Sequence, residues 1–101
     1  KESIIIPVNL FGNECDLNKI REVADSTNSI ILEDCAQSTG IPNQKKATVS
    51  IHSFYPTKPL GCRGDGGAVL TNDEELFKRI KKSTIKIFNY KNKFLKFKLL
   101  N

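Results

Sequence analysis

Residues 4–34 read IIIPVNLFGNECDLNKIREVADSTNSIILED, and this stretch decides the fold class. The β-branched run from Ile4 to Val8 is typical of a buried strand, and Ile30 to Leu32 predict a second strand that stops at Glu33-Asp34. Between them, residues 16–25 alternate apolar and charged side chains with the 3.6-residue period of an amphipathic helix. We therefore expect strand, helix, strand, which is a βαβ unit with two parallel strands.

The helix is expected to begin after Asp16, whose carboxylate can cap the first turn. Its inward face is predicted to consist of four apolar residues. These are Leu17, Ile20, Val23 and Ala24. The turn-prone pair Gly12-Asn13 precedes the helix, and residues 26–29 are expected to end it.

The rest of the chain extends the sheet. Residues 49–54 alternate as a third strand, and Ala68 to Leu70 predict a fourth. Thr71 or Asn72 is expected to cap a second helix, since an acidic first turn and basic last turns complement the helix dipole there. The fold class is therefore α/β, with a partial, mostly parallel sheet and flanking helices.

Length and patterning indicate a single domain. A chain of 101 residues supports one modest core, and because it begins with Lys1 and contains no Met we expect a piece of a longer protein. Residues 1–82 are predicted to be a domain fragment, in which Gln44-Lys45-Lys46 is a surface turn. Residues 83–101 show neither convincing helical nor strand periodicity, so this basic tail is left unassigned.

The net charge of +5 is concentrated at one end. Residues 1–80 hold nine basic and eleven acidic side chains, whereas residues 81–101 hold seven lysines and no acid. Interleaved lysines and aromatic residues could bind phosphates and stack on bases, but a solvated terminal segment explains the pattern at least as well. Nucleic acid is therefore not an expected partner.

The cysteines indicate neither a disulfide framework nor a metal site. Cys15, Cys35 and Cys62 are widely spaced, and only His52 could add a further soft ligand. This usage is typical of the reducing cytoplasm. The apolar run of residues 3–11 is too short to span a bilayer, so no membrane association is expected.

Lys58 stands in the most informative local motif, Ser53-Phe54-Tyr55-Pro56-Thr57-Lys58. Pro56 fixes its own backbone, and Pro59 disfavours the helical region for the residue before it. The amine is thus placed on a stiff, non-helical turn, as a reactive lysine requires. Most turn lysines are solvated surface charges, and this alternative stays open on the motif alone.

Asp34 is predicted to stand at the carboxyl end of a parallel strand, where open α/β folds bind their ligands. An alternative is structural, because Asp34-Cys35-Ala36-Gln37 has the form of a helix capping box. A carboxylate paired with a lysine on a turn is also what pyridoxal 5'-phosphate (PLP) needs. The cofactor takes an amine for its Schiff base and an acid opposite its ring nitrogen.

The glycine cluster of residues 61–67 does not match a phosphate-binding loop, because it lacks both nucleotide-binding spacings and precedes a strand. Its glycines are expected to allow positive φ angles or a close approach of the backbone to a cofactor or subunit.

Four motifs in order resemble the DegT-type sugar aminotransferases. They are residues 7–12 (PVNLFG), 33–37 (EDCAQ), 53–58 (SFYPTK) and 64–76 (GDGGAVLTNDEEL). The resemblance covers roughly residues 4 to 82 and implies the large domain of a fold type I PLP enzyme. It further implies a homodimer in the full-length protein that transfers an amine, usually from glutamate, to a nucleotide-linked keto sugar in polysaccharide or natural-product biosynthesis.

The resemblance also implies a role for individual residues. Asp34 corresponds to the partner of the pyridine nitrogen, and Gln37 to the residue beside the ring. Ser53 corresponds to a phosphate contact and Lys58 to the Schiff-base lysine. Two departures stand out: the segment between Lys46 and His52 is shorter than in the family pattern, and Pro59 replaces the usual Asn.

Two other functions fit parts of the sequence. One is a catalytically inactive remnant of the fold whose basic tail binds anionic partners. The other is an ordinary nucleotide-binding domain, which the missing glycine fingerprint after the first strand disfavours. Because the resemblance implies further segments around the site, activity is expected of the longer protein and not of the isolated 101 residues.

Overall fold

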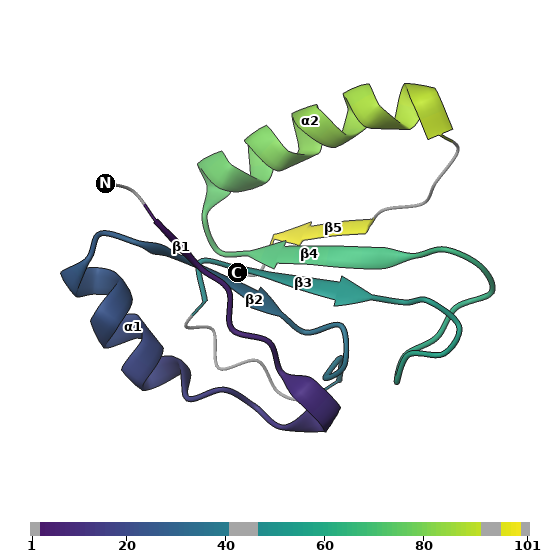
Figure 1. Ribbon diagram of the computed structural model, residues 1–101. Helices are drawn as coiled ribbons and strands as arrows, with labels where there is room; N and C mark the ends of the chain where they lie inside the picture. The colour runs from purple at the N-terminus through teal and green to yellow at the C-terminus, as the bar shows by residue number, and fades with distance from the viewer. Residues whose placement is uncertain (1–2, 41–46, 92–95, 100–101) are drawn as a thin grey trace.

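The computed structural model describes residues 3–40, 47–91 and 96–99. These residues form one five-stranded sheet, a short 3-10 turn and two α-helices (Figure 1). In chain order the elements are β1 (Ile4–Ile5), η1 (Leu10–Gly12), α1 (Leu17–Ser26), β2 (Ile30–Asp34), β3 (Val49–Ser53), β4 (Gly67–Thr71), α2 (Glu74–Lys91) and β5 (Lys96–Leu99).

The sheet has the strand order β1-β2-β3-β4-β5. Strands β1 and β2 are parallel, β2 and β3 are parallel, and β4 and β5 are parallel, whereas β3 and β4 form an antiparallel pair. Helix α1 packs against β2, and α2 packs against β4 and β5, so the helices lie at different ends of the sheet (Figure 1). The predicted α/β class with a mostly parallel sheet is confirmed.

Helix α1 begins where the sequence predicts. The Asp16 carboxylate accepts hydrogen bonds from the backbone N–H groups of Asn18 (3.1 Å) and Lys19 (3.2 Å). These bonds lower the pKa of Asp16, and the hydrogen bond from the backbone of Lys19 has the largest effect. Leu17 and Ala24 are buried against Ile31 of β2, and this cluster is the core of the βαβ unit.

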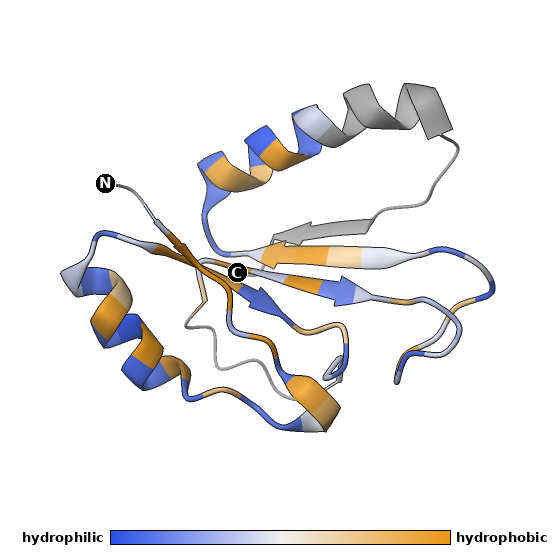
Figure 2. Cartoon of the chain, in the orientation of Figure 1, coloured by the Kyte–Doolittle hydropathy of each residue, from blue (hydrophilic) through white to orange (hydrophobic). Residues whose placement is uncertain are grey.

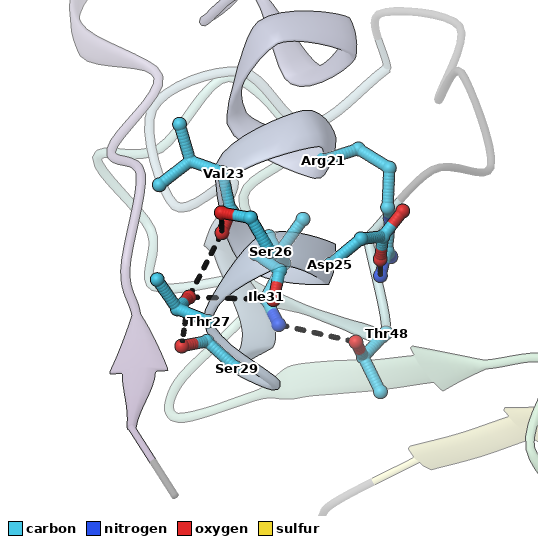
Figure 3. A network of polar contacts seen from close by, with 9 residues as sticks. Arg21, Val23, Asp25, Ser26, Thr27, Ser29, Ile31 and Thr48 are labelled. Carbon is cyan, nitrogen blue, oxygen red and sulfur yellow. Dashed lines mark hydrogen bonds and ion pairs between the residues drawn. The ribbon is translucent and has the colours of Figure 1, made fainter. Parts of the chain in front are cut away.

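The end of α1 is closed by short polar side chains (Figure 3). Thr27 Oγ1 donates to the Val23 carbonyl at 2.8 Å and lies 2.7 Å from Ser29 Oγ. The chain then turns through Asn28, which has a φ of 50°. The backbone N–H of Ile31 donates to Thr48 Oγ1 at 3.1 Å, which joins β2 to the approach to β3.

Several expectations about burial were wrong. Val23, predicted to face the core, is 55% exposed, and Ile4 at the first strand is 59% exposed. Strand β1 is shorter than predicted and lies at the edge of the described sheet, with Ile5 packed on the core. Because side chains alternate along a strand, Ile4 points to the face opposite Ile5, which α1 does not cover. Ile6, which directly follows the strand, is 56% exposed. Figure 2 shows the apolar character of this edge.

The cap of α2 also differs from the prediction. Neither Thr71 nor Asn72 caps the helix, because the Asp73 carboxylate accepts from the backbone N–H of Leu76 at 2.9 Å. Thr71 Oγ1 instead donates to the Thr48 carbonyl at 2.8 Å and accepts from the Asp73 N–H at 3.1 Å. Thr71 therefore connects the end of β4 to Thr48, which directly precedes β3. Helix α2 begins after Asp73, at Glu74.

The tail contains elements that the periodicity did not indicate. Helix α2 continues through Lys91, and Lys96–Leu99 pair with β4 as β5. A strand is fixed by its pairing partner, which local periodicity does not report. The predicted surface turn at residues 44–46 lies outside the described residues.

Candidate active site

Asp34 is the last residue of β2, and its backbone is held on both sides. It pairs with Ile51 of β3 and bridges to Val8. Its N–H donates to the Pro7 carbonyl at 2.8 Å, and its carbonyl accepts from the Asn9 N–H at 3.0 Å. The carboxylate is therefore carried by a fixed strand end.

The half-buried side chain of Asp34 does not cap a helix. One of its oxygens, Oδ1, accepts from the backbone N–H of Ala36 at 3.0 Å, and residues 36–38 form a turn. The alternative that Asp34 to Gln37 form a helical capping box is thus wrong. Gln37 lies exposed in this turn, directly after the strand end.

Ser53 stands at the same edge of the sheet as Asp34. It is the last residue of β3, and β3 runs parallel to β2, so the carboxyl ends of the two strands coincide. Asp34 pairs with Ile51, and Ser53 follows two residues later, so Asp34 and Ser53 belong to one face of the sheet. Ser53 Oγ is 3.4 Å from the backbone nitrogen of Tyr55, which donates to it.

Lys58 lies in the connection between β3 and β4, residues 54–66. Its backbone N–H donates to the Tyr55 carbonyl at 2.8 Å, which closes a turn over Pro56 and Thr57. The Lys58 side chain is half-buried, in contrast to the exposed residues on both sides of it. The predicted non-helical turn is confirmed.

Glycines allow the backbone of this connection to pack closely against neighbouring parts of the chain. A Cβ at Gly61 would lie 2.6 Å from the Pro56 carbonyl oxygen, and one at Gly67 would lie 2.8 Å from the His52 carbonyl oxygen. Gly64 has a φ of 107°, which side chains rarely adopt. A Cβ at Gly66 would lie 2.8 Å from the Cys62 sulfur. The cluster therefore permits a positive φ and close approaches, and in the described structure these approaches are to atoms of the chain itself.

The structure places Asp34 and Ser53 at the carboxyl ends of β2 and β3, at one edge of the sheet. Gln37 and Lys58 lie in the two segments that follow these strands. Within the described residues, no hydrogen bond or ion pair joins any two of these four side chains. A shallow hollow elsewhere on the sheet contains none of them. Its lining residues are Ser3, Ile4, Asn28, Ser29 and Ile30.

The sequence did not indicate the buried polar group on the opposite face of β2 from Asp34. Glu33, 4% exposed, accepts a hydrogen bond from Asn9 Nδ2 at 2.8 Å. Burial, together with the Glu33 charge, raises the pKa of the Cys35 thiol to about 12. The thiol is therefore not a nucleophile at neutral pH. A buried acid next to Asp34 was visible in the pair Glu33-Asp34, but its partner Asn9 is 24 positions away.

The three cysteines are unpaired. Among the residues that the structure describes, no group of three or more His, Cys, Asp or Glu side chains is placed to hold a metal ion. In the same ranges, neither helix is both apolar and long enough to cross a bilayer.

Comparison with known proteins identifies the family. The model of the DegT/DnrJ/EryC1/StrS aminotransferase family matches residues 1–96 of this chain. The chain belongs to this family. The match runs past residue 82, where the sequence placed the end of the domain fragment.

Curated relatives match most of this chain and a small part of their own length. The chain is 47% identical over 77 residues to the UDP-2-acetamido-2-deoxy-3-oxo-D-glucuronate aminotransferase of Pseudomonas aeruginosa, covering 71% of this chain and 21% of the relative. It is 43% identical over 82 residues to the dTDP-3-amino-3,4,6-trideoxy-alpha-D-glucose transaminase of Streptomyces venezuelae, covering 76% and 22%. The chain therefore spans about a fifth of the length of these relatives.

Solved structures of the family have the same fold over the matched region. A DegT DnrJ EryC1 StrS aminotransferase from Brucella abortus superposes with a TM-score of 0.71 at 44% identity, covering 77% of this chain and 22% of that one. DesV of S. venezuelae, in complex with a ketimine intermediate, gives 0.72 at 42% identity, covering 78% and 23%. NtdA of Bacillus subtilis, with the bound cofactor PMP, gives 0.71 at 36% identity, covering 73% and 17%. The aminotransferases of this family are PLP-dependent.

Proposed function

We propose that this chain supplies the cofactor-binding strands of a PLP-dependent sugar aminotransferase. The observation that carries the proposal is the shared carboxyl edge of β2 and β3. There Asp34 and Ser53 end adjacent parallel strands, and Lys58 follows on a turn closed by its own backbone hydrogen bond. Such an edge is the usual ligand-binding position in open α/β sheets.

The side chains at this edge fit the chemical groups of PLP. Asp34, which accepts one hydrogen bond from the Ala36 N–H, would supply the carboxylate that pairs with the protonated ring nitrogen. We assign Ser53 to the phosphate and Gln37 to the side of the ring. When bound, PLP supplies an aldehyde for amines and a ring that withdraws electrons from the neighbouring carbon.

The remaining chemistry belongs to Lys58. Its Nζ is a primary amine, which would hold the cofactor covalently through its aldehyde. As a free amine, Nζ would also serve as the base that accepts a proton and returns it. Arginine cannot replace it, because a guanidinium stays protonated at neutral pH.

For the substrates we propose glutamate as the amine donor and a nucleotide-linked keto sugar as the acceptor. The names of the relatives support the acceptor class, because they act on UDP-linked and dTDP-linked sugars. We further propose that residues 1–82 form part of the large domain of a longer, homodimeric protein. The unpaired cysteines support its placement in the cytoplasm.

The test uses the full-length protein that contains this chain. Glutamate and a UDP-linked or dTDP-linked 3-keto sugar are supplied, and formation of the amino sugar is followed by mass spectrometry. We expect amine transfer by the wild type and loss by about a thousandfold or more in Lys58→Arg, since the Nζ base is removed. The matched control is Lys78→Arg on the exposed surface of α2, which should retain activity. Full activity of Lys58→Arg would refute the assignment.

A further inference from the structure

A buried hydrogen bond joins the segment after β1 to the end of β2. Asn9 Nδ2 donates to Glu33 Oε1 at 2.8 Å, and both residues are almost fully buried, at 2% and 4% exposed. Asn9 Oδ1 accepts from the backbone N–H of Cys15 at 2.9 Å. The carboxamide of Asn9 is therefore fixed at both of its polar atoms.

Asn9 contacts three consecutive residues around the candidate acid. Its side chain donates to Glu33 and approaches the Cys35 sulfur at 3.7 Å, and its backbone N–H donates to the Asp34 carbonyl at 3.0 Å. One residue thus holds the strand before, at and after Asp34. Cys35 is held from the other side as well, since its N–H donates to the Ile51 carbonyl.

The alternation of a strand connects these contacts to the Asp34 side chain. Glu33 and Asp34 are neighbours in β2, so their side chains point to opposite faces of the sheet. A rotation of the strand end that moved the Asp34 carboxylate would also have to move Glu33 within its buried site. Glu33 Oε2 has no hydrogen-bond partner in the described residues, so this carboxylate relies on the contacts at its other oxygen.

We propose that Asn9 and Glu33 are positioning residues that fix the direction of the Asp34 carboxylate through their buried hydrogen bond. The inference rests on the proposed role of Asp34 at the ring of PLP. Neither residue touches the cofactor in this account. Both act from the opposite face of the sheet, as outer partners orient the ligands of other sites.

The test reverses the polarity of the hydrogen bond in the full-length protein. Asn9→Asp places a second carboxylate against Glu33, which removes the donor and adds repulsion. Asn9→Asp with Glu33→Gln restores a donor and an acceptor in swapped positions at the original net charge. Asn13→Asp makes the same change at an exposed position of the same segment and is the matched control.

Three quantities are measured for each variant: the unfolding temperature, the dissociation constant of PLP by visible absorbance, and the pH midpoint of the cofactor band. We expect Asn9→Asp to weaken PLP binding by about tenfold or more, a size typical of outer partners, and to move the pH midpoint. The double variant and Asn13→Asp should both resemble the wild type. A role limited to folding would lower the unfolding temperature but leave the pH midpoint of the bound fraction unchanged.

The outcomes separate the inference from the proposed function. A wild type that does not bind PLP refutes the proposed function. A wild type that binds PLP, together with a folded Asn9→Asp variant of equal affinity and midpoint, overturns this inference alone. If Asn9→Asp does not fold, the double variant decides: wild-type binding supports the inference, and an unfolded or weakly binding double variant overturns it.

Discussion

The imidazole of His52, next to Ser53 in β3, has a pKa that is changed by its surroundings. His52 directly precedes Ser53, with Nε2 3.2 Å from Ser50 Oγ and Nδ1 3.3 Å from Thr39 Oγ1. Burial lowers its pKa from the usual 6.5, although the charges of Glu33 and Asp34 act in the opposite direction. The folded chain therefore favours neutral His52.

This shift predicts a pH dependence of stability. Well above pH 6.5 His52 is neutral in both the folded and the unfolded chain and contributes nothing to the pH dependence. As the pH falls below 6.5, the unfolded chain binds a proton first, so stability decreases until the lower folded pKa is passed. Denaturant unfolding from about pH 8 to about pH 5 should show this decrease. Since His52 is the only histidine, His52→Asn should flatten the profile, and an unchanged slope would contradict the assignment.

At the residue scale, the sequence predicted contacts between near neighbours better than distant ones. The cap of α1 by Asp16 is confirmed. It could be predicted from the sequence because donor and acceptor lie within three positions of each other. The bond between Asn9 and Glu33 spans 24 positions, and it forms only because β1 and β2 are adjacent in the sheet. No local pattern reports such a pair.

At the element scale, the connection that carries Lys58 depends on the contact of Gly61 with Pro56. Gly61→Ala would place a Cβ 2.6 Å from a backbone oxygen, so the loop must shift. We expect a loss of unfolding free energy of about 1–3 kcal/mol, as for other overpacked sites. Denaturant titration measures this loss. Thr57→Ala, at an exposed position of the same loop, is the control, and equal stability of the two variants would contradict the role of Gly61.

The start of α2 gives a second prediction for an element. Asp73→Ala removes the acceptor for the Leu76 N–H and should cost about 1 kcal/mol of unfolding free energy. Asn72→Ala, one residue earlier, should cost much less. Thermal unfolding followed by circular dichroism compares them, and a larger effect at Asn72 would favour the cap that the sequence predicted.

The elements themselves were largely predictable. Hydrophobic periodicity placed α1 and the strands β2, β3 and β4 to within a few residues. It failed for β5 and for the later turns of α2, because the seven lysines of residues 81–101 are interspersed with apolar residues without a clear helical or strand period. The edge of the sheet that holds Asp34 and Ser53 was predictable because parallel strands end together.

At the scale of the whole molecule, one sheet face near β1 is apolar and exposed. Ile4, Ile6 and Ile30 are 59%, 56% and 43% exposed. Parallel sheets are normally covered on both faces, and exposed apolar patches promote association. Their apolar character predicted that these residues are buried. The prediction failed because composition does not show which face of a strand a neighbouring segment covers.

Because this apolar face is exposed, we expect the isolated 101-residue chain to self-associate. Ile6→Lys should reduce self-association in light scattering while leaving the circular dichroism spectrum intact, since its side chain faces solvent. Ile5→Lys is the matched opposite, because Ile5 packs against the core and a charge there should unfold the chain. Equal association of wild type and Ile6→Lys would contradict this account of the face.

Covalent trapping determines whether Lys58 is the lysine that binds PLP. The full-length protein is loaded with PLP, reduced with borohydride, digested and mapped by mass spectrometry. Reduction makes the bond between the cofactor and its lysine permanent, so one labelled peptide reports the site. We expect the label on Lys58 and its loss in Lys58→Arg. A label on another lysine, or none in a protein that binds PLP, would contradict this assignment.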